Sequence, residues 1–362
     1  MTDKRPKLPG RIGDPTLLMA FDPRLDPRIA AMMQQMPPEM SSAANPAVIN
    51  PSYEECCAYY DEQESEVAAS MNEMMTTMPA FEDIDVRKFS ITGDDGADIE
   101  LTVYRPASAV DPLPGVVYIH GGGMVILSAK HPPCVRWAKS LAAQGQVVIA
   151  VEFRNGAGKL GRHPFPAGLN DCAAATRWVG EHRAELGISS LTVSGESGGG
   201  NLTLATVLKA KQDGWINLID GVYALCPCIF GDYVNAAAYF ASWQENETYF
   251  MSIRGMSALA TVYDPTSRNA SNPLAWPYFA DADLLSGLPP HVISVNELDP
   301  LRDEGLAYYK KLAAAGVSVV ARTVNGTPHG GDFALVDIVP EVVAATRRDI
   351  YGFACSLTSA QV

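Results

Sequence analysis

The chain has 362 residues, with 41 acidic against 27 basic side chains and a formal net charge of −14 at pH 7. A field of this sign repels nucleic acid and leaves neutral small molecules free to approach, so we expect no nucleic-acid partner. Hydrophobic residues make up 47% of the chain, enough for a substantial core, but they form no uninterrupted run of membrane-spanning length. We therefore also expect no stable insertion into a membrane.

The N-terminus and the cysteines bear on the cellular compartment. The opening "MTDKRPKLPGRIGDP" has basic residues with no apolar stretch behind them, so it does not resemble a signal peptide. The seven cysteines are odd in number and lack the spacing of a zinc site or a redox pair. Free thiols in a reducing cytoplasm are the simplest interpretation.

The first 85 residues form a segment of their own. Residues 1–50 are rich in proline and predict irregular structure with one short helix. After Pro51, Ser52 and Glu55 have the spacing of a capping box, and apolar residues then recur at helical period as far as Met78.

Strand and helix patterns alternate through the rest of the chain. Short apolar, β-branched runs predict strands over 86–91, 99–106, 115–120, 147–151, 191–194, 221–226, 291–295 and 317–324. Helical patterns lie between most of them, at 134–144, 171–186 and 301–316. The alternation predicts an α/β fold with a mostly parallel central sheet flanked by helices. The core would comprise residues 86–229 and 272–362, with 230–271 as an insertion above the sheet.

A serine among glycines follows the strand at 191–194. Gly195, Ser197 and Gly199 form G-x-S-x-G between that strand and a helix beginning near Asn201, the pattern of a nucleophile on a sharp strand-to-helix turn. Two alternatives are a glycine turn with an idle serine and a phosphate-binding loop. The Lys-Ser/Thr pair of a P-loop is missing, which counts against the second.

A second glycine-rich stretch, "HGGG" at 120–123, ends an earlier strand. Consecutive glycines let backbone N–H groups turn towards a cavity. We predict an oxyanion hole from the amides of Gly122 and Gly123 together with that of Gly198. His120 is expected to fix this loop by hydrogen bonding rather than to take part in the reaction.

A nucleophilic serine needs a base and an acid that orients the base. His329 lies in a glycine-rich loop after the last strand, where the base belongs in the chain order Ser, acid, His. Asp299 follows the strand at 291–295 and is the preferred acid, although Asp before Pro also suits a helix N-cap. Glu297 is the alternative acid, and Asp303 would already lie inside the next helix. An unperturbed imidazole base predicts that kcat/KM falls below about pH 6.

With these residues in place, the chain resembles the hormone-sensitive-lipase-like group of α/β-hydrolases, and within it the bacterial brefeldin A esterase type. The matching blocks, in order, are "HGGGM", "RHPFPAG", "GESGGGN", "NELDPLRDEG" and the late "HGG". The resemblance implies the triad Ser197, Asp299 and His329, the three oxyanion amides, and a cap built from the N-terminal segment and the 230–271 insertion. Two blocks depart from the group: Gly-Asp-Ser-Ala-Gly-Gly is Gly-Glu-Ser-Gly-Gly-Gly at 195–200, and the tyrosine-arginine-leucine-alanine block is replaced at 152–161.

The expected reaction is hydrolysis of a small carboxylic ester through an acyl-enzyme, with no metal or organic cofactor. Short- to medium-chain acyl groups, a bulky neutral ester or a lactone are the expected substrates. Aromatic residues of the insertion would supply wall material for the pocket. A non-hydrolytic ligand receptor and an amidase or acyltransferase remain alternatives, and a homodimer stays open.

Overall fold

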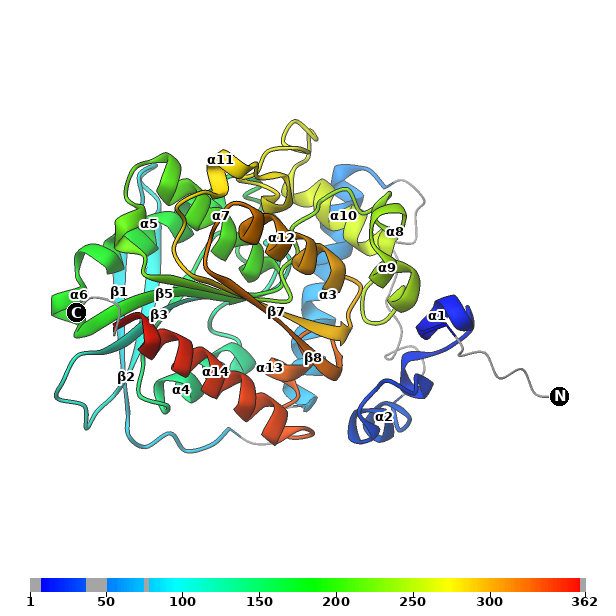
Figure 1. Cartoon of the computed structure of the whole chain (residues 1–362), viewed down its shortest axis with the longest axis horizontal. Coiled ribbons are helices and arrows are strands. Elements are labelled where there is room, and N and C mark those ends of the chain that lie inside the picture. The colour runs from blue at the N-terminus through cyan, green and yellow to red at the C-terminus, as the bar shows by residue number, and fades with distance from the viewer. Residues whose placement is uncertain (1–7, 37–50, 75–77, 359–362) are drawn as a thin grey trace.

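The computed structural model describes residues 8–36, 51–74 and 78–358. These residues form an eight-stranded sheet with the order β1-β2-β4-β3-β5-β6-β7-β8 (Figure 1). β2 pairs antiparallel with both β1 and β4, and the pairings from β4 through β3 to β8 are parallel. The strands are β1 (Ile84–Thr92), β2 (Asp98–Pro106), β3 (Leu113–Ile119), β4 (Val147–Glu152), β5 (Ile188–Glu196), β6 (Gly221–Leu225), β7 (His291–Leu298) and β8 (Val319–Pro328).

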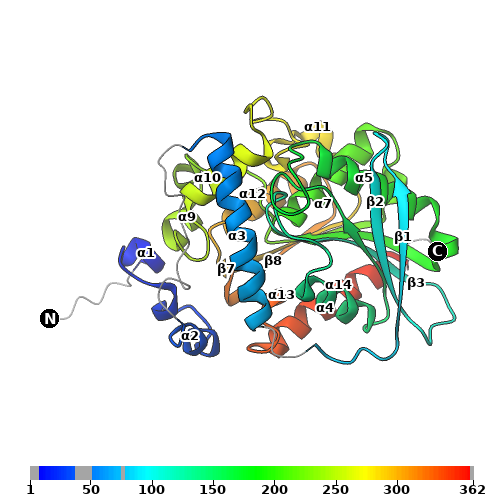
Figure 2. The same cartoon turned by 180° about the vertical axis from the view of Figure 1, so that it is seen from behind.

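Helices cover both faces of the sheet (Figures 1 and 2). On one face lie α4 (Pro132–Ala142), α13 (Gly331–Ala334) and α14 (Pro340–Thr358). On the other lie α5 (Ala167–Glu181), α6 (Arg183–Leu186), α7 (Gly198–Gln212), α11 (Ala282–Leu285) and α12 (Arg302–Ala314), with the short 3₁₀ turns η3 (Ile216–Leu218) and η4 (Pro277–Phe279). The two layers bury alternate residues of each strand: Val117 and Ile119 belong to one apolar cluster and Tyr118 to the other.

The predicted strands and the α/β fold class are confirmed. The helix predicted over 171–186 is instead two helices, because the backbone leaves helical geometry at His182, where φ is −107° and ψ is 21°. There the His182 ring stacks on Trp178, and its Nδ1 donates to the Trp178 carbonyl at 2.8 Å. The helix after Ser197 begins at Gly198, three residues earlier than predicted.

The N-terminal segment contains α1 (Gly10–Gly13), η1 (Met19–Phe21), α2 (Pro27–Met33) and α3 (Tyr53–Met74). The predicted capping box is present at α3, where the Ser52 N–H donates to Glu55 at 2.8 Å and the Glu55 N–H donates to the Ser52 hydroxyl at 3.3 Å. Further along α3, the buried Glu64 accepts the backbone N–H groups of Leu127 at 2.9 Å and Lys159 at 2.8 Å. One carboxylate therefore ties α3 to the loops that follow β3 and β4.

The 230–271 insertion contains α8 (Ala236–Tyr239), α9 (Ala241–Asn246) and α10 (Ile253–Tyr263). In Figure 1 the arrow of β7 ends beside α9, so the insertion lies at the carboxyl end of the parallel strands. α10 packs against α3, and the Tyr60 hydroxyl donates to the Gly255 carbonyl at 2.9 Å. None of the helices in the described ranges has the length and apolarity needed to cross a membrane.

The close packing of α7 on β3 gives a stability test. A Cβ at Gly199 would overlap the carbonyl oxygen of Ile119, whereas one at Gly352, exposed on α14, would meet nothing within 4 Å. We expect Gly199→Ala to lower the free energy of unfolding by about 3 kcal/mol or more, because backbone must move to make room. The control Gly352→Ala should raise it by about 0.5–1 kcal/mol. Urea unfolding followed by circular dichroism measures both, and equal effects would contradict the packing described.

Candidate active site

Ser197 lies between the end of β5 and the first residue of α7. Its φ of 57° is rare for a residue with a side chain and marks a strained turn. Ser197 is partly exposed, whereas every other residue from Ser190 to Leu208, a stretch described without gaps, is buried. The chain therefore presents this one hydroxyl to solvent at the carboxyl end of the sheet.

The glycines around Ser197 are required by contacts of the backbone. A Cβ at Gly195 would overlap the carbonyl oxygen of Ile119, and one at Gly199 would overlap that same oxygen. Hydrogen bonds then fix the turn against the loop after β6: the Ser197 N–H donates to the Leu225 carbonyl at 2.9 Å, and the Cys228 N–H donates to the Ser197 carbonyl at 3.2 Å. The turn is thus held from both sides.

His329 and Asp299 meet at the same edge of the sheet. The Nδ1 atom of His329 lies 2.8 Å from Oδ2 of Asp299, which is fully buried. Because a carboxylate can only accept, Nδ1 carries the proton in the neutral imidazole, and Nε2 then keeps its lone pair. The other oxygen, Oδ1, accepts the Leu301 N–H at 2.8 Å, so both carboxylate oxygens are held.

The two alternative acids lie in other contacts. Glu297 accepts the Gly326 N–H at 2.8 Å, and Asp303 accepts the Ser242 N–H at 2.8 Å from within α12. Of the three carboxylates considered from the sequence, Asp299 is the one placed against His329.

The charge of Asp299 controls the proton affinity of His329. Burial alone would lower the pKa of His329, but the Asp299 carboxylate outweighs it and raises the pKa well above 6.5. The Cys226 thiol also lies close, since ligand atoms of Cys226, Asp299 and His329 are all within 4.8 Å of one another. Burial raises the pKa of Cys226, which keeps the thiol neutral. A metal here would need the thiolate and would break the His329–Asp299 hydrogen bond, so this group fits a proton-transfer site better than a metal site.

The glycines of the "HGGG" loop lie against Gly198. Gly122 and Gly123 have φ values of 100° and 65°, which favour glycine. A Cβ at Gly198 would lie 2.5 Å from the backbone nitrogen of Gly123 and 2.6 Å from that of Met124. The amide-rich loop and the first turn of α7 are therefore in direct contact. From the other side, Leu259 of α10 occupies the space that a Cβ at Gly123 would need.

His120 is buried inside this loop. Its Nδ1 donates to the Gly121 carbonyl at 2.7 Å, and its ring stacks on Phe153 with centroids 4.3 Å apart. Burial lowers the pKa of His120 to about 4, so the ring is neutral. These contacts agree with a role in fixing the loop.

Glu196 is a residue of the site that the sequence analysis did not single out. Its Oε1 accepts the Gly121 N–H at 2.7 Å and the Tyr118 hydroxyl at 3.0 Å. Burial raises the pKa of Glu196 to about 8, although both of these donors lower it. The glutamate in place of the group's usual aspartate was the one signal of its importance in the sequence.

The loop that carries His329 depends on a second set of buried polar groups that the sequence did not indicate. Asn296 donates to Asp332 at 2.9 Å and to the Thr327 hydroxyl at 2.8 Å, and its Oδ1 accepts the Gly330 N–H at 3.2 Å. Thr346 of α14 donates to the other oxygen of Asp332 at 2.8 Å. The histidine loop is thereby anchored to β7 and α14.

The aromatic residues of the insertion mostly pack on one another. Of the seven aromatic residues between positions 230 and 250, which were expected to supply wall material, Tyr239 and Phe250 are exposed and the other five are buried: Phe230, Tyr233, Phe240, Trp243 and Tyr249. The Phe230 ring alone contacts the rings of Tyr233, Tyr239, Phe240, Tyr278 and Phe279. This cluster belongs to the same apolar core as the sheet, and it packs the insertion against Tyr278 and Phe279 of η4.

Comparison with known proteins agrees with this geometry. A family model described as the α/β-hydrolase fold matches residues 116–332. The chain is 34% identical over 288 residues to carboxylesterase NlhH of Mycobacterium tuberculosis, covering 78% of this chain and 86% of that protein. Among solved structures, a bacterial brefeldin A esterase homologous to human hormone-sensitive lipase aligns with a TM-score of 0.92 and 42% identity, covering 98% of this chain and all of that one. The esterase Est22 aligns with a TM-score of 0.80 and 37% identity over 92% of this chain and 98% of its own.

The family match runs from β3 to β8 and includes Ser197, Asp299 and His329, and the aligned brefeldin A esterase structure covers 98% of this chain. The chain belongs to the hormone-sensitive-lipase-like family of α/β-hydrolases.

Proposed function

We propose that this carboxylic-ester hydrolase works with Ser197 as nucleophile, His329 as base and Asp299 as the acid that orients the base. The observation that carries the proposal is the Nδ1 hydrogen bond of His329 to Asp299, formed at the edge of the sheet where Ser197 is partly exposed. It leaves Nε2 as the free base. Relatives named as carboxylesterases support the same chemistry.

The reaction follows from these positions. The Ser197 oxygen bonds to the ester carbonyl carbon while its proton passes to Nε2 of His329. The carbonyl oxygen becomes an oxyanion, for which we propose the amides of Gly122, Gly123 and Gly198 as donors. The C–O bond to the leaving alkoxide then breaks, and the alkoxide takes the proton from His329. A water molecule, deprotonated by the same imidazole, then bonds to the acyl carbon; the bond from that carbon to the Ser197 oxygen breaks, the serine oxygen takes the proton back from His329, and the carboxylic acid leaves.

The surroundings of the loop favour a neutral ester. Leu259 packs on Gly123, and Val262 of the same helix packs on Gly156, so α10 presents apolar side chains over the oxyanion loop. A net charge of −14 disfavours polyanionic substrates. Short- to medium-chain or bulky neutral esters, lactones included, are the proposed class, with the N-terminal segment (residues 1–85) and the insertion as its cap. The alternatives of a receptor, an amidase or an acyltransferase have no specific observation in their favour.

Two further proposals concern the cellular compartment and the oligomeric state. None of the seven cysteines, all of them within the described residues, forms a disulfide bond, and we expect a reducing compartment such as the cytoplasm. A homodimer stays a prediction that light scattering on the purified protein can test.

Replacing the nucleophile is the primary test. Ser197→Ala should lower kcat for p-nitrophenyl butyrate by on the order of 10⁴–10⁶, because the acyl-enzyme can no longer form. Circular dichroism should show an unchanged fold. Ester turnover above a tenth of wild type would show that another group is the nucleophile. Matched p-nitroanilides, expected to be poor substrates, separate esterase from amidase.

The pH dependence tests the base. Since His329 must be neutral to accept a proton and Asp299 raises its pKa well above 6.5, kcat/KM should fall as the pH drops through a value above 6.5. This replaces the limit near pH 6 expected for an unperturbed imidazole. Asp299→Asn should lower kcat by about 10⁴ and move the acid limb to lower pH. A flat profile from pH 8 to pH 5 would contradict His329 as the base.

Glu196 gives a test of the oxyanion loop. Glu196→Gln keeps an oxygen for the Gly121 N–H, and we expect its kcat at pH 7 to stay within about threefold of wild type, because the group is then largely neutral in both forms. Glu196→Ala leaves that buried N–H without an acceptor and should lower kcat by about 10². Steady-state kinetics compares the two, and equal losses would show that the hydrogen bond to Gly121 does not position the loop.

A further inference from the structure

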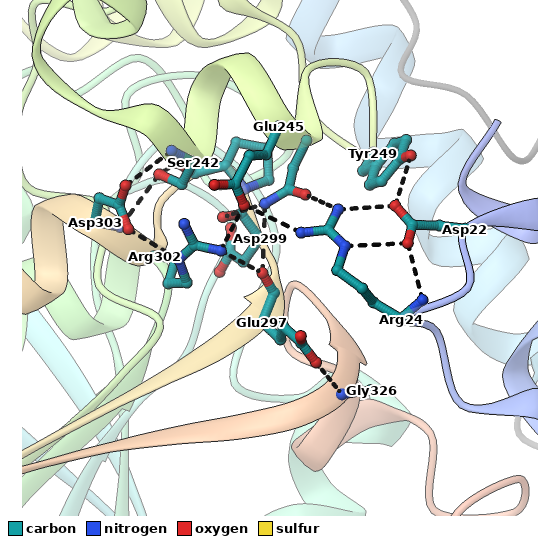
Figure 3. A network of polar contacts seen from close by, with 12 residues as sticks. Asp22, Arg24, Ser242, Glu245, Tyr249, Glu297, Asp299, Arg302, Asp303 and Gly326 are labelled. Carbon is teal, nitrogen blue, oxygen red and sulfur yellow. Dashed lines mark hydrogen bonds and ion pairs between the residues drawn. The ribbon is translucent and has the colours of Figure 1, made fainter. Parts of the chain in front are cut away.

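A network of buried charges joins the N-terminal segment to the insertion (Figure 3). Arg24 is held in a fork by the fully buried Asp22 side chain, with Nε–Oδ1 at 3.0 Å and Nη2–Oδ2 at 2.8 Å, and Asp22 also accepts the Tyr249 hydroxyl at 3.0 Å. From this fixed position the guanidinium reaches α9. Its Nη1 donates to Glu245 at 3.1 Å, and its Nη2 donates to Oδ1 of Asn246 at 2.8 Å.

The same two residues of α9 hold the end of β7. The Asn246 amide nitrogen donates to the backbone carbonyls of Asp299 at 3.2 Å and Glu297 at 3.4 Å. Glu245 accepts a second guanidinium, that of Arg302, at 2.9 Å, and Arg302 also donates to the Glu297 carbonyl at 3.0 Å. Nearby, Ser242 donates to the Pro300 carbonyl at 2.7 Å. The carbonyls of 297, 299 and 300 are therefore all bound by side chains of α9 and its partner Arg302.

The N-terminal segment also touches the strand that leads to His329. The Asp26 N–H donates to the Gly326 carbonyl at 2.9 Å, and the Gly326 N–H donates to the Glu297 carboxylate at 2.8 Å. Gly326 lies three residues before His329 in the sequence. One short stretch of the chain, Asp22 to Asp26, thus contacts both α9, which binds the carbonyls of Glu297 and Asp299, and the end of β8, which leads to His329.

We propose that Arg24 is a positioning residue for ester hydrolysis: by orienting the Asn246 amide it fixes the peptide of Asp299, and with it the carboxylate that orients His329. The inference rests on the proposed function of that pair. The Asp299 carboxylate extends from a backbone whose carbonyl Asn246 binds, so a turn of this peptide moves the carboxylate as well. Displacements of about 1 Å in such a group reduce turnover by about 10².

The low exposure of the network makes these contacts effective. The side chains of Arg24 and Glu245 are 15% and 11% exposed, so water competes poorly for their hydrogen bonds. Asn246 is fully buried, and the Arg24 guanidinium is the donor that holds its Oδ1. With the oxygen held, the amide nitrogen is directed at Asp299 and Glu297. Without the hydrogen bond from Arg24, the side-chain amide of Asn246 can rotate.

The chain supplies a matched control for Arg24. Arg28 makes the same fork to Asp26, with Nε–Oδ1 at 3.0 Å and Nη2–Oδ2 at 2.8 Å, but its further partner is Glu341 and not the insertion. Arg24→Met should lower kcat by about 10- to 100-fold with KM within about threefold of wild type. Arg28→Met should leave both constants unchanged.

The pH profile separates positioning from a general loss of structure. In wild type His329 faces Asp299, Cys226 and Glu196, and none of these residues changes in the variants. Arg24→Met should move the acid limb of kcat/KM to lower pH, because a displaced Asp299 raises the pKa of His329 less. A lower melting temperature with wild-type kcat and an unmoved limb would overturn the inference.

Asn246→Ala tests the connection and covers the case in which Arg24→Met does not fold. It leaves the Arg24–Asp22 and Arg24–Glu245 pairs in place but removes the bond to Asp299, and should lower kcat and shift the limb as Arg24→Met does. The double variant should lose little more than Asn246→Ala alone, because the two residues act in series. The inference would be overturned if the fold-losses in kcat of the two single variants multiplied in the double variant, or if Asn246→Ala kept the wild-type kcat. The proposed function fails separately, if Ser197→Ala keeps its activity.

Discussion

The hydrogen bond between Nδ1 of His329 and the Asp299 carboxylate is the contact around which the carboxyl edge of the sheet is organised. It fixes the imidazole tautomer, raises its proton affinity and sets where Nε2 lies. Neither partner could hold this geometry alone, since both lie on loops. These loops are restrained on one side by backbone amides, Asn296 and Asp332, and on the other side by residues of α9.

The parallel sheet brings the loops that carry Ser197, Asp299 and His329 to the same edge once the strand order is set. β5, β6, β7 and β8 are neighbours, so the residues following them emerge side by side although Ser197 and His329 are 132 positions apart (329 − 197). The strained turn at Ser197 and the glycines of the 120–123 loop then add what the sheet cannot: a partly exposed hydroxyl and a glycine-rich loop in contact with the first turn of α7. Function in this fold lies in these loops and in what restrains them.

The sequence predicted what is encoded locally and missed what depends on distant contacts. Strand periodicity, the capping box at Ser52 and the glycine pattern around Ser197 depend on residues within a few positions of one another, and the structure contains all of them. From the sequence, Asp299 could be preferred to Glu297 as the orienting acid, but the choice could not be decided. Glu297, Asp299 and Asp303 all follow the same predicted strand, 291–295. Arg24 and Glu245 are 221 positions apart, and nothing near either residue indicates the other.

The contact of Leu259 with Gly123 bears on how such enzymes diversify. Leu259 of α10 occupies the space where any residue other than glycine at position 123 would have its side chain, so the two surfaces interlock. Exchanging the 230–271 segment for that of a homologue would leave either a void or a collision at this point unless the loop were transplanted with it. The 230–271 segment and the 120–123 loop are therefore structurally coupled, and a change in one requires a matching change in the other.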